Sequence, residues 1–225
     1  MRNIVNDHAK VDRKLVEAFV SMTDVMSVSC VVGDAQERTN IMRSDMKMRS
    51  VNRPFIGPAL TVKLTPGDIV DCLAIFDIAE AGDVVVIDAF GDTESSIWGG
   101  LMAGLARAAG IVGVVIDGSA RDIDEAKMLD FPIVSKSVSP RAAHSALSER
   151  FEPIEINTGI VCGGVRVNPG DIIVADEIGV TVVPQADMEN VYKAAREQAD
   201  KEEATRQEIL KGATVKELLE KFGRI

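Results

Sequence analysis

The sequence has little of what several protein classes need. Only three cysteines occur in 225 residues (Cys30, Cys72 and Cys162), and they form no Cys-x-x-Cys pair. Their number and spacing exclude a disulfide framework and a zinc knuckle, and predict buried, reduced thiols. The two histidines, His8 in an expected frayed end and His144 in a polar segment, form no metal-ligand cluster. Zinc is therefore disfavoured, and a Ser-His-Asp triad has no candidate geometry.

Basic residues and long apolar runs are also scarce. Lys and Arg number 25 against 35 Asp and Glu, which gives a formal net charge of −10. This balance weighs against nucleic acid and anionic membranes as partners. No window approaches about 18 consecutive apolar residues, and the first residues lack the apolar core of a signal peptide. We therefore expect a cytoplasmic protein that binds neither nucleic acid nor a membrane.

Two nucleotide-binding loops are missing as well. Glycine is plentiful, with 18 residues, but no Gly-x-Gly-x-x-Gly follows a strand and no Gly-Lys-Ser/Thr loop occurs. Nicotinamide and ATP chemistry are therefore disfavoured. The hydrophobic fraction of 46% is ordinary for a globular chain. Because no linker interrupts the sequence, we predict a single domain over residues 1–225.

Hydrophobic periodicity divides this domain into three parts. Apolar residues at helical spacing predict an N-terminal helix within 8–24, and a charged segment at 186–222 predicts a long C-terminal helix followed by a short one. The core at 55–183 lies between them. Residues 33–54, polar and rich in arginine, read as a long loop with a helical turn.

Strands alternate with helices in the first half of the core. This order predicts an α/β fold with parallel strand pairing. The expected strands are 60–64, 83–88 and 112–116, and the expected helices are 69–81, 99–109 and 122–129. In the second half, Gly163-Gly164 predicts a tight hairpin over 161–167, followed by strands at 172–175 and 180–183.

Two glycine-containing turns are the most informative feature. Gly99-Gly100-Leu101-Met102 opens a predicted helix, so free backbone N–H groups and the positive end of the helix dipole point at whatever lies there. The second turn, one strand later, ends in Arg121-Asp122. In a strand-helix-strand unit both turns emerge at the carboxyl ends of the strands, where α/β proteins form their sites.

The chemistry of these turns suits an enzyme acting on a small carboxylated substrate. The Leu101 and Met102 amides can bind a carboxylate, Arg121 is a fixed cation, and Asp122 can hold Mg²⁺ or Mn²⁺ with several waters. A plainer alternative stays open, in which the glycines allow close packing, the arginine pairs with an acid and the aspartate favours a helix N-terminus. Asp117 either faces the site or caps the turn.

With Phe131-Pro132-Ile133-Val134 and the run PGDIIVADEIGV at 169–180, these motifs resemble the RraA-like family. That family includes 4-hydroxy-4-methyl-2-oxoglutarate/4-carboxy-4-hydroxy-2-oxoadipate aldolases and the RraA regulators of ribonuclease E. The resemblance extends over residues 55–212. It implies a swivelling β/β/α-type sandwich with a long C-terminal helix, assembled as trimers or hexamers with sites between subunits.

The resemblance also implies roles by position. Asp122 would be the metal ligand, Arg121 would hold the pyruvate oxygens, and the turn Gly99–Met102 would bind the carboxylate. The implied enzyme is a divalent-metal-dependent lyase that cleaves a 4-hydroxy-2-oxo acid to pyruvate, because the metal and the arginine can stabilise the enolate left by the cleavage. The same arrangement would decarboxylate oxaloacetate.

One departure from the family pattern concerns Gly100. Aldolases of the family tend to have an acidic residue immediately before the Leu-Leu pair, so here the general base is open. A glutamate from the C-terminal helix of a neighbouring subunit could contribute, and Glu202 is preferred over Glu197. The rival hypothesis is a non-catalytic RraA-type regulator that binds a ribonuclease or RNA helicase. A methyltransferase is a weaker alternative, because no glycine-rich cofactor loop is present.

Overall fold

Parallel strands form the centre of the computed structural model, which describes residues 3–65, 72–143 and 154–223. In spatial order they are β3 (Phe55–Lys63), β4 (Val84–Trp98), β5 (Gly113–Ala120) and β6 (Ile133–Val138). Each neighbouring pair is parallel. Helix α3 (Gly100–Ala108) connects β4 to β5, and α4 (Ile123–Met128) connects β5 to β6. The predicted α/β alternation is confirmed.

Antiparallel and edge strands extend this sheet. At one edge, β7 (Glu155–Ile156) pairs with β3 and with β1 (Ile4–Val5). At the other edge, β2 (Lys47–Met48) pairs with β6. The first residues of β3 pair instead with β10 (Ile172–Ala175), which in turn pairs with β11 (Val180–Val183). Strand β3 therefore belongs to both the parallel sheet and a second, antiparallel layer.

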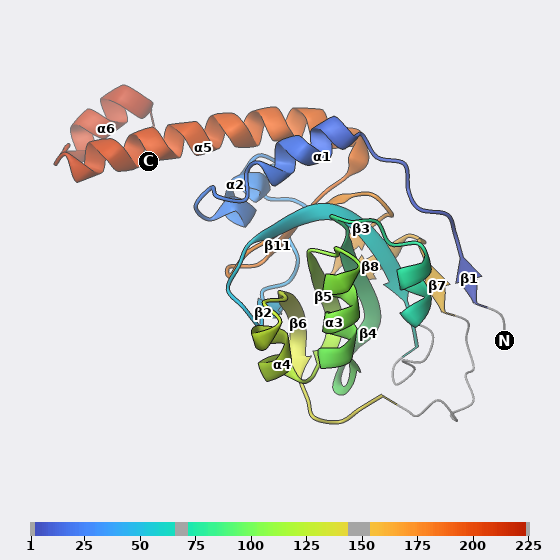
Figure 1. Cartoon of the computed structure of the whole chain (residues 1–225). Coiled ribbons are helices and arrows are strands. Elements are labelled where there is room, and N and C mark those ends of the chain that lie inside the picture. Colours follow the sequence, from blue (N-terminus) through green and yellow to red (C-terminus); the bar gives the residue numbers. More distant parts are fainter. Residues whose placement is uncertain (1–2, 66–71, 144–153, 224–225) are drawn as a thin grey trace.

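Three apolar cores lie between the layers. Helices α3 and α4 cover one face of the parallel sheet (Figure 1), where Ile116 lies. The opposite face, with Val115, packs on β10, β11 and the predicted hairpin of β8 (Ile160–Cys162) and β9 (Val165–Val167). Adjacent residues of β5 enter different cores because strand side chains alternate. A third core joins the outer face of β10 and β11 to the terminal helices.

The terminal helices form the outermost layer on that side. They are α1 (Arg13–Val20), α2 (Val28–Asp34) and α5 (Met188–Leu210). Helix α5 buries only a stripe of apolar and small residues, and α6 (Val215–Phe222) lies against its far end, as Figure 1 shows. The long C-terminal helix and the sandwich architecture expected from the sequence are present. Among the described residues, no helix combines the length and apolar character needed to span a membrane.

Several local expectations need correction. The N-terminal helix covers only Arg13–Val20 within the expected 8–24. His8 is not part of a frayed end, because its Nε2 lies 2.8 Å from the buried Asp83 carboxylate. Helix α2 was not predicted, and the described part of the expected helix 69–81 is a 3-10 helix, η1 (Cys72–Asp77).

The cysteine prediction is correct for two of the three residues. Cys72 and Cys162 are buried, whereas Cys30 is exposed on α2. Burial raises the pKa of the Cys72 thiol to about 12, so this thiol stays protonated at neutral pH. His144 lies outside the described residues.

Candidate active site

The Gly99-Gly100 turn begins α3 directly after β4. Gly99 is the N-cap and provides no side-chain cap. The Gly100 N–H donates to Asp122 Oδ2 at 3.2 Å, and the Ala103 N–H donates to the Gly99 carbonyl at 3.0 Å. The Leu101 and Met102 amides find no acceptor in the described part of the chain. The start of α3 therefore presents two N–H groups that are free to bind an anion.

Arg121 and Asp122 lie where β5 ends. The Arg121 N–H donates to the Trp98 carbonyl at 2.9 Å, which ties the exit of β5 to the end of β4. Asp122 has a φ of 52°, in the left-handed region that aspartate adopts more readily than most residues. Its carboxylate does not cap α4, the helix that it precedes. Instead, Oδ2 lies 3.3 Å from Arg121 Nε, and both side chains are 40% exposed.

The two glycines leave room for two carboxylates. A Cβ on Gly99 would lie 2.5 Å from Asp122 Oδ2, and a Cβ on Gly100 would overlap the carboxylate of Glu125. Glu125 lies in the first turn of α4, and Asp122 is the residue just before that helix. The two acids meet the start of α3 side by side, Asp122 against Gly99 and Glu125 against Gly100. Glu125 was not predicted from the sequence, where the available signal was an acid in the first turn after Asp122.

Together, Gly99, Gly100, Arg121, Asp122 and Glu125 form what we call the Arg-Asp corner. It combines one guanidinium group, two carboxylates and, at its edge, the free amides of α3. Among the described residues, no group of three or more His, Cys, Asp or Glu is arranged to hold a metal. Two carboxylates without a third protein ligand fit Mg²⁺ or Mn²⁺, which retain waters, better than they fit zinc.

Asp117 belongs to a separate group on the opposite face of the sheet. Its Oδ1 accepts from Lys136 Nζ at 2.8 Å, and its Oδ2 accepts from the Gly163 N–H at 2.8 Å. Asp88 lies nearby, and its Oδ1 accepts from the Phe90 N–H at 3.0 Å. Burial, with the charge of Asp117, raises the pKa of Asp88. This inner cluster of Asp88, Asp117 and Lys136 fixes the β8–β9 hairpin to the sheet and does not face the Arg-Asp corner.

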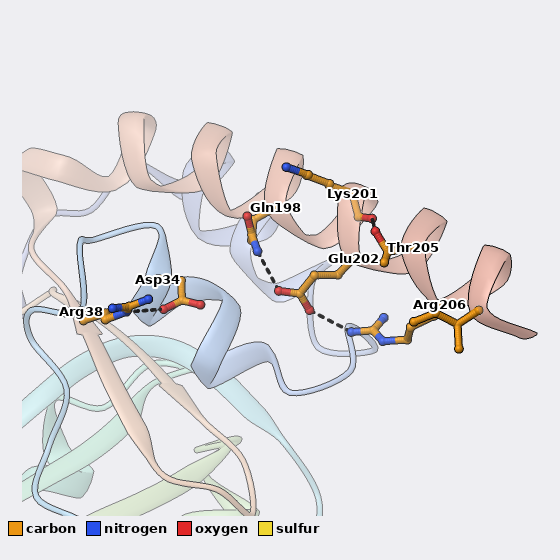
Figure 2. A pocket seen from close by; sticks show the side chains of 8 residues that line it. Asp34, Arg38, Gln198, Lys201, Glu202, Thr205 and Arg206 are labelled. Carbon is orange, nitrogen blue, oxygen red and sulfur yellow. Dashed lines mark hydrogen bonds and ion pairs between the residues drawn. The ribbon is translucent and has the colours of Figure 1, made fainter. Parts of the chain in front are cut away.

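Glu202 lies in another layer of the molecule. On α5 it accepts from Gln198 Nε2 at 2.8 Å and from Arg206 Nη2 at 2.9 Å (Figure 2). It lines a groove of about 340 Å³ between α5 and the segment that contains Asp34 and Arg38. Helices α3 and α4 pack on a different core. Within one chain Glu202 is therefore not brought to Asp122, and only a second copy could place it there.

Comparison with known proteins shows the family of the chain. Residues 25–182 match the family model RraA-like, described as Aldolase/RraA. The chain belongs to the RraA-like family. The matched region includes every residue of the Arg-Asp corner, whereas α1, α5 and α6 lie outside it. This finding confirms the family predicted from the glycine turns and the Arg121-Asp122 pair.

Individual relatives agree with the family assignment. A Halalkalibacterium halodurans protein named "Putative 4-hydroxy-4-methyl-2-oxoglutarate aldolase" is 39% identical over 185 residues, 82% of this chain and 85% of that protein. A structure of an uncharacterized Pseudomonas syringae protein is similar in fold, with a TM-score of 0.79, 23% identity and coverage of 96% and 98% of the two chains. Streptomyces coelicolor RraAS2, titled an unusual member of the RNase ES inhibitor RraA family, gives a TM-score of 0.72, 25% identity and coverage of 88% and 100%.

Proposed function

We propose that this RraA-like protein is a divalent-metal-dependent carbon–carbon lyase that cleaves a 4-hydroxy-2-oxo acid to pyruvate. The proposal rests on the Arg-Asp corner, where a guanidinium group and two carboxylates lie beside free helix amides. The name of the 39% identical relative supports the lyase class. The resemblance to RraAS2 raises the regulatory alternative, but a protein that acts only by binding another protein has no need of this corner.

Asp122 would hold the metal. Its carboxylate would bind a Mg²⁺ or Mn²⁺ ion, with waters as the remaining ligands. When bound, the ion would act as a Lewis acid toward the oxygens of the 2-oxo acid. Because Asp122 Oδ2 already faces Arg121 and Gly100, its Oδ1 is the atom left for this purpose.

The remaining groups would bind the substrate and move its protons. The Leu101 and Met102 amides bind the carboxylate, and Arg121 binds the 2-oxo oxygen. Glu125 accepts the proton of the 4-hydroxyl group as the C3–C4 bond breaks and its electron pair moves toward the 2-oxo oxygen. Arg121 stabilises the resulting enolate, and return of a proton to C3 gives pyruvate. Loss of CO₂ from oxaloacetate forms the same enolate, so we propose this second activity too.

The proposal includes an assembly of several copies. The site of a homotrimer or hexamer would lie between subunits, and Glu202 would enter it from a neighbouring copy. Glu125 already lies in the corner, so the proton transfer is assigned to Glu125 and a supporting role to Glu202. Light scattering on the protein as it elutes from a size-exclusion column measures the mass of the assembly, and so the number of its subunits.

The deciding experiment is pyruvate release from a panel of 4-hydroxy-2-oxo acids and oxaloacetate. We expect turnover with added Mg²⁺ or Mn²⁺, its loss with a chelator, and its return when the metal is restored. The Arg121→Ala variant provides the matched inactive control. If no member of the panel gives metal-dependent pyruvate, the lyase proposal is wrong, and inhibition of a ribonuclease becomes the activity to measure.

A further inference from the structure

One peptide group determines how Arg121 leaves β5. The carbonyl of Ala120 and the N–H of Arg121 belong to the same planar unit, so fixing that plane fixes the position of the Arg121 Cα atom and the N–Cα bond from which its side chain is built. On one side, the N–H donates to the Trp98 carbonyl at 2.9 Å. On the other side, the Ala120 carbonyl accepts from the Ser139 N–H at 3.0 Å. The last residue of β4 and the residue that follows β6 therefore hold this plane from both sides.

A buried hydroxyl group contacts the same plane. Ser96 is 1% exposed, and its Oγ lies 3.0 Å from the Ala120 carbonyl oxygen and 2.6 Å from the Ser139 carbonyl oxygen. A buried hydroxyl is unfavourable unless it is hydrogen-bonded. The Ala120 carbonyl already has a backbone donor, so Ser96 is not needed merely to satisfy that oxygen. Its contacts instead join the ends of three strands at the point where Arg121 emerges.

Ser119 completes the junction. Its Oγ lies 3.1 Å from Ser96 Oγ, and Ser119 is fully buried. Each hydroxyl group has one proton, so Ser119 can donate to Ser96 while Ser96 donates to a carbonyl. Such a chain of hydrogen bonds has little freedom to rearrange in a close-packed interior.

We propose that Ser96 is a positioning residue that aims the Arg121 side chain at Asp122. This inference rests on the proposed function only for its catalytic consequence, since the geometry it predicts is a property of the free protein. Ser96 touches neither the substrate nor a metal in this proposal. It acts by fixing the peptide plane before Arg121, so that the guanidinium group meets the Asp122 carboxylate at the observed distance of 3.3 Å.

The chain offers a matched control in Ser135. This serine is also fully buried, lies on β6 of the same sheet, and donates one bond to a carbonyl, that of Ser137, at 2.7 Å. Its side chain makes no hydrogen bond with the peptide before Arg121. Ser96→Ala and Ser135→Ala thus remove the same group from similar surroundings, and only the first should change the Arg121 geometry.

The test is the NMR signal of the Arg121 Nε–H in the free protein, assigned by its loss in Arg121→Lys. In Ser96→Ala we expect the signal to move most of the way to its position in Asp122→Asn, and in Ser135→Ala to stay at the wild-type position. Ser96→Thr, which keeps the hydroxyl group, should return the signal to its wild-type position. If Ser96→Ala does not fold, Ser96→Cys provides the same test, because it leaves no empty space and donates only weakly. An unchanged signal in the Ser96 variant, or an equal shift in both variants, overturns the proposal.

A second measurement separates this inference from the proposed function. Oxalate, a planar dianion that resembles the pyruvate enolate, is titrated in the presence of Mg²⁺. We expect Ser96→Ala to bind it about tenfold more weakly, since small misplacements of a positioned group are costly, and Ser135→Ala to bind as the wild type does. If the wild type itself neither binds oxalate nor releases pyruvate, the lyase proposal fails while the NMR result still decides the role of Ser96.

Discussion

The Arg-Asp corner and the inner cluster occupy opposite faces of the same sheet, and both place charged side chains near the carboxyl ends of its strands. The inner cluster is closed. Asp117 is 7% exposed, and both of its oxygens accept hydrogen bonds, one from a lysine and one from a backbone amide. The corner is open, because Asp122 and Arg121 remain 40% exposed and Asp122 Oδ1 has no recorded hydrogen bond among the described residues.

This difference separates a structural charge from one available to a ligand. Burying an ion is so unfavourable that a buried carboxylate must be paired and hydrogen-bonded. A carboxylate at the surface has no such requirement, yet Asp122 is held by a left-handed backbone and by two glycines that make space for it and for Glu125. A carboxylate that is held in place but still has an oxygen without a hydrogen bond is expected in a binding site. We therefore expect substitutions in the corner to lower activity, and substitutions in the inner cluster to lower stability.

The largest expected effect comes from Asp122→Asn. Asparagine also tolerates the left-handed conformation and can accept from Gly100, so the fold should be retained while the negative charge is lost. We expect kcat/KM for pyruvate release to fall about 10³-fold, the loss typical of removing one group that stabilises developing charge. Urea unfolding, run alongside the assay, should match the wild type. Near-normal turnover would show that Asp122 is not the metal ligand.

Glu125→Gln tests the acid of the corner that was not predicted from the sequence. Removing a general base typically lowers the rate about 10²- to 10⁴-fold, and we expect a value near the lower end because the side chain is exposed and water can substitute. Asp124→Asn is the matched control, since it removes the adjacent exposed acid from the same turn of α4. Equal activity of the two variants would contradict the role given to Glu125.

Much of the corner was predictable from the sequence because it follows from topology. Parallel strands joined by helices bring successive turns to one sheet edge, so Gly99-Gly100 and Arg121-Asp122 had to meet once β4, α3 and β5 were recognised. The positions of these elements follow from continuous apolar runs and from glycines at helix ends. Helix α2 was harder to predict from the sequence, because it is short and follows Ser27, which has a left-handed φ of 55° and provides no side-chain cap.

The alternation of side chains along a strand does not predict that Asp117 and Arg121 lie on opposite faces of the sheet. In a regular strand, residues four apart point to the same face. Here β5 pairs irregularly with β6 between Ile116 and Ser119, and β4 has three shifts of register opposite the same stretch. Because of these irregularities, and because β5 ends at Ala120, Asp117 enters the inner cluster while Arg121 reaches the corner. Glu202 was equally inaccessible, since its layer depends on how α5 packs on α1 and α2.

Asp117→Asn should lower stability and leave activity unchanged, which is the reverse of the result expected for Asp122→Asn. Breaking a buried ion pair while leaving Lys136 in place lowers the free energy of unfolding by about 3–5 kcal/mol, and the side chains involved are 10% and 15% exposed. We expect urea unfolding to show this loss and the folded protein to retain its kcat. A double variant with Lys136→Met should recover part of the stability, because no unpaired charge is left behind. Loss of kcat without loss of stability would place Asp117 in the site after all.

The smallest expected effect is a pH dependence within the inner cluster. Burial, reinforced by the charge of Asp117, raises the pKa of Asp88, so the folded state binds this proton more tightly than the unfolded state, where the pKa is about 3.9. The resulting stabilisation is complete below that value and is lost as the pH rises through the raised pKa. Asp88→Asn keeps an acceptor for the Phe90 N–H but cannot titrate. The unfolding free energy of the wild type, measured relative to this variant, should therefore decrease from pH 4 upward, and parallel curves would show that Asp88 is as well solvated as a surface carboxylate.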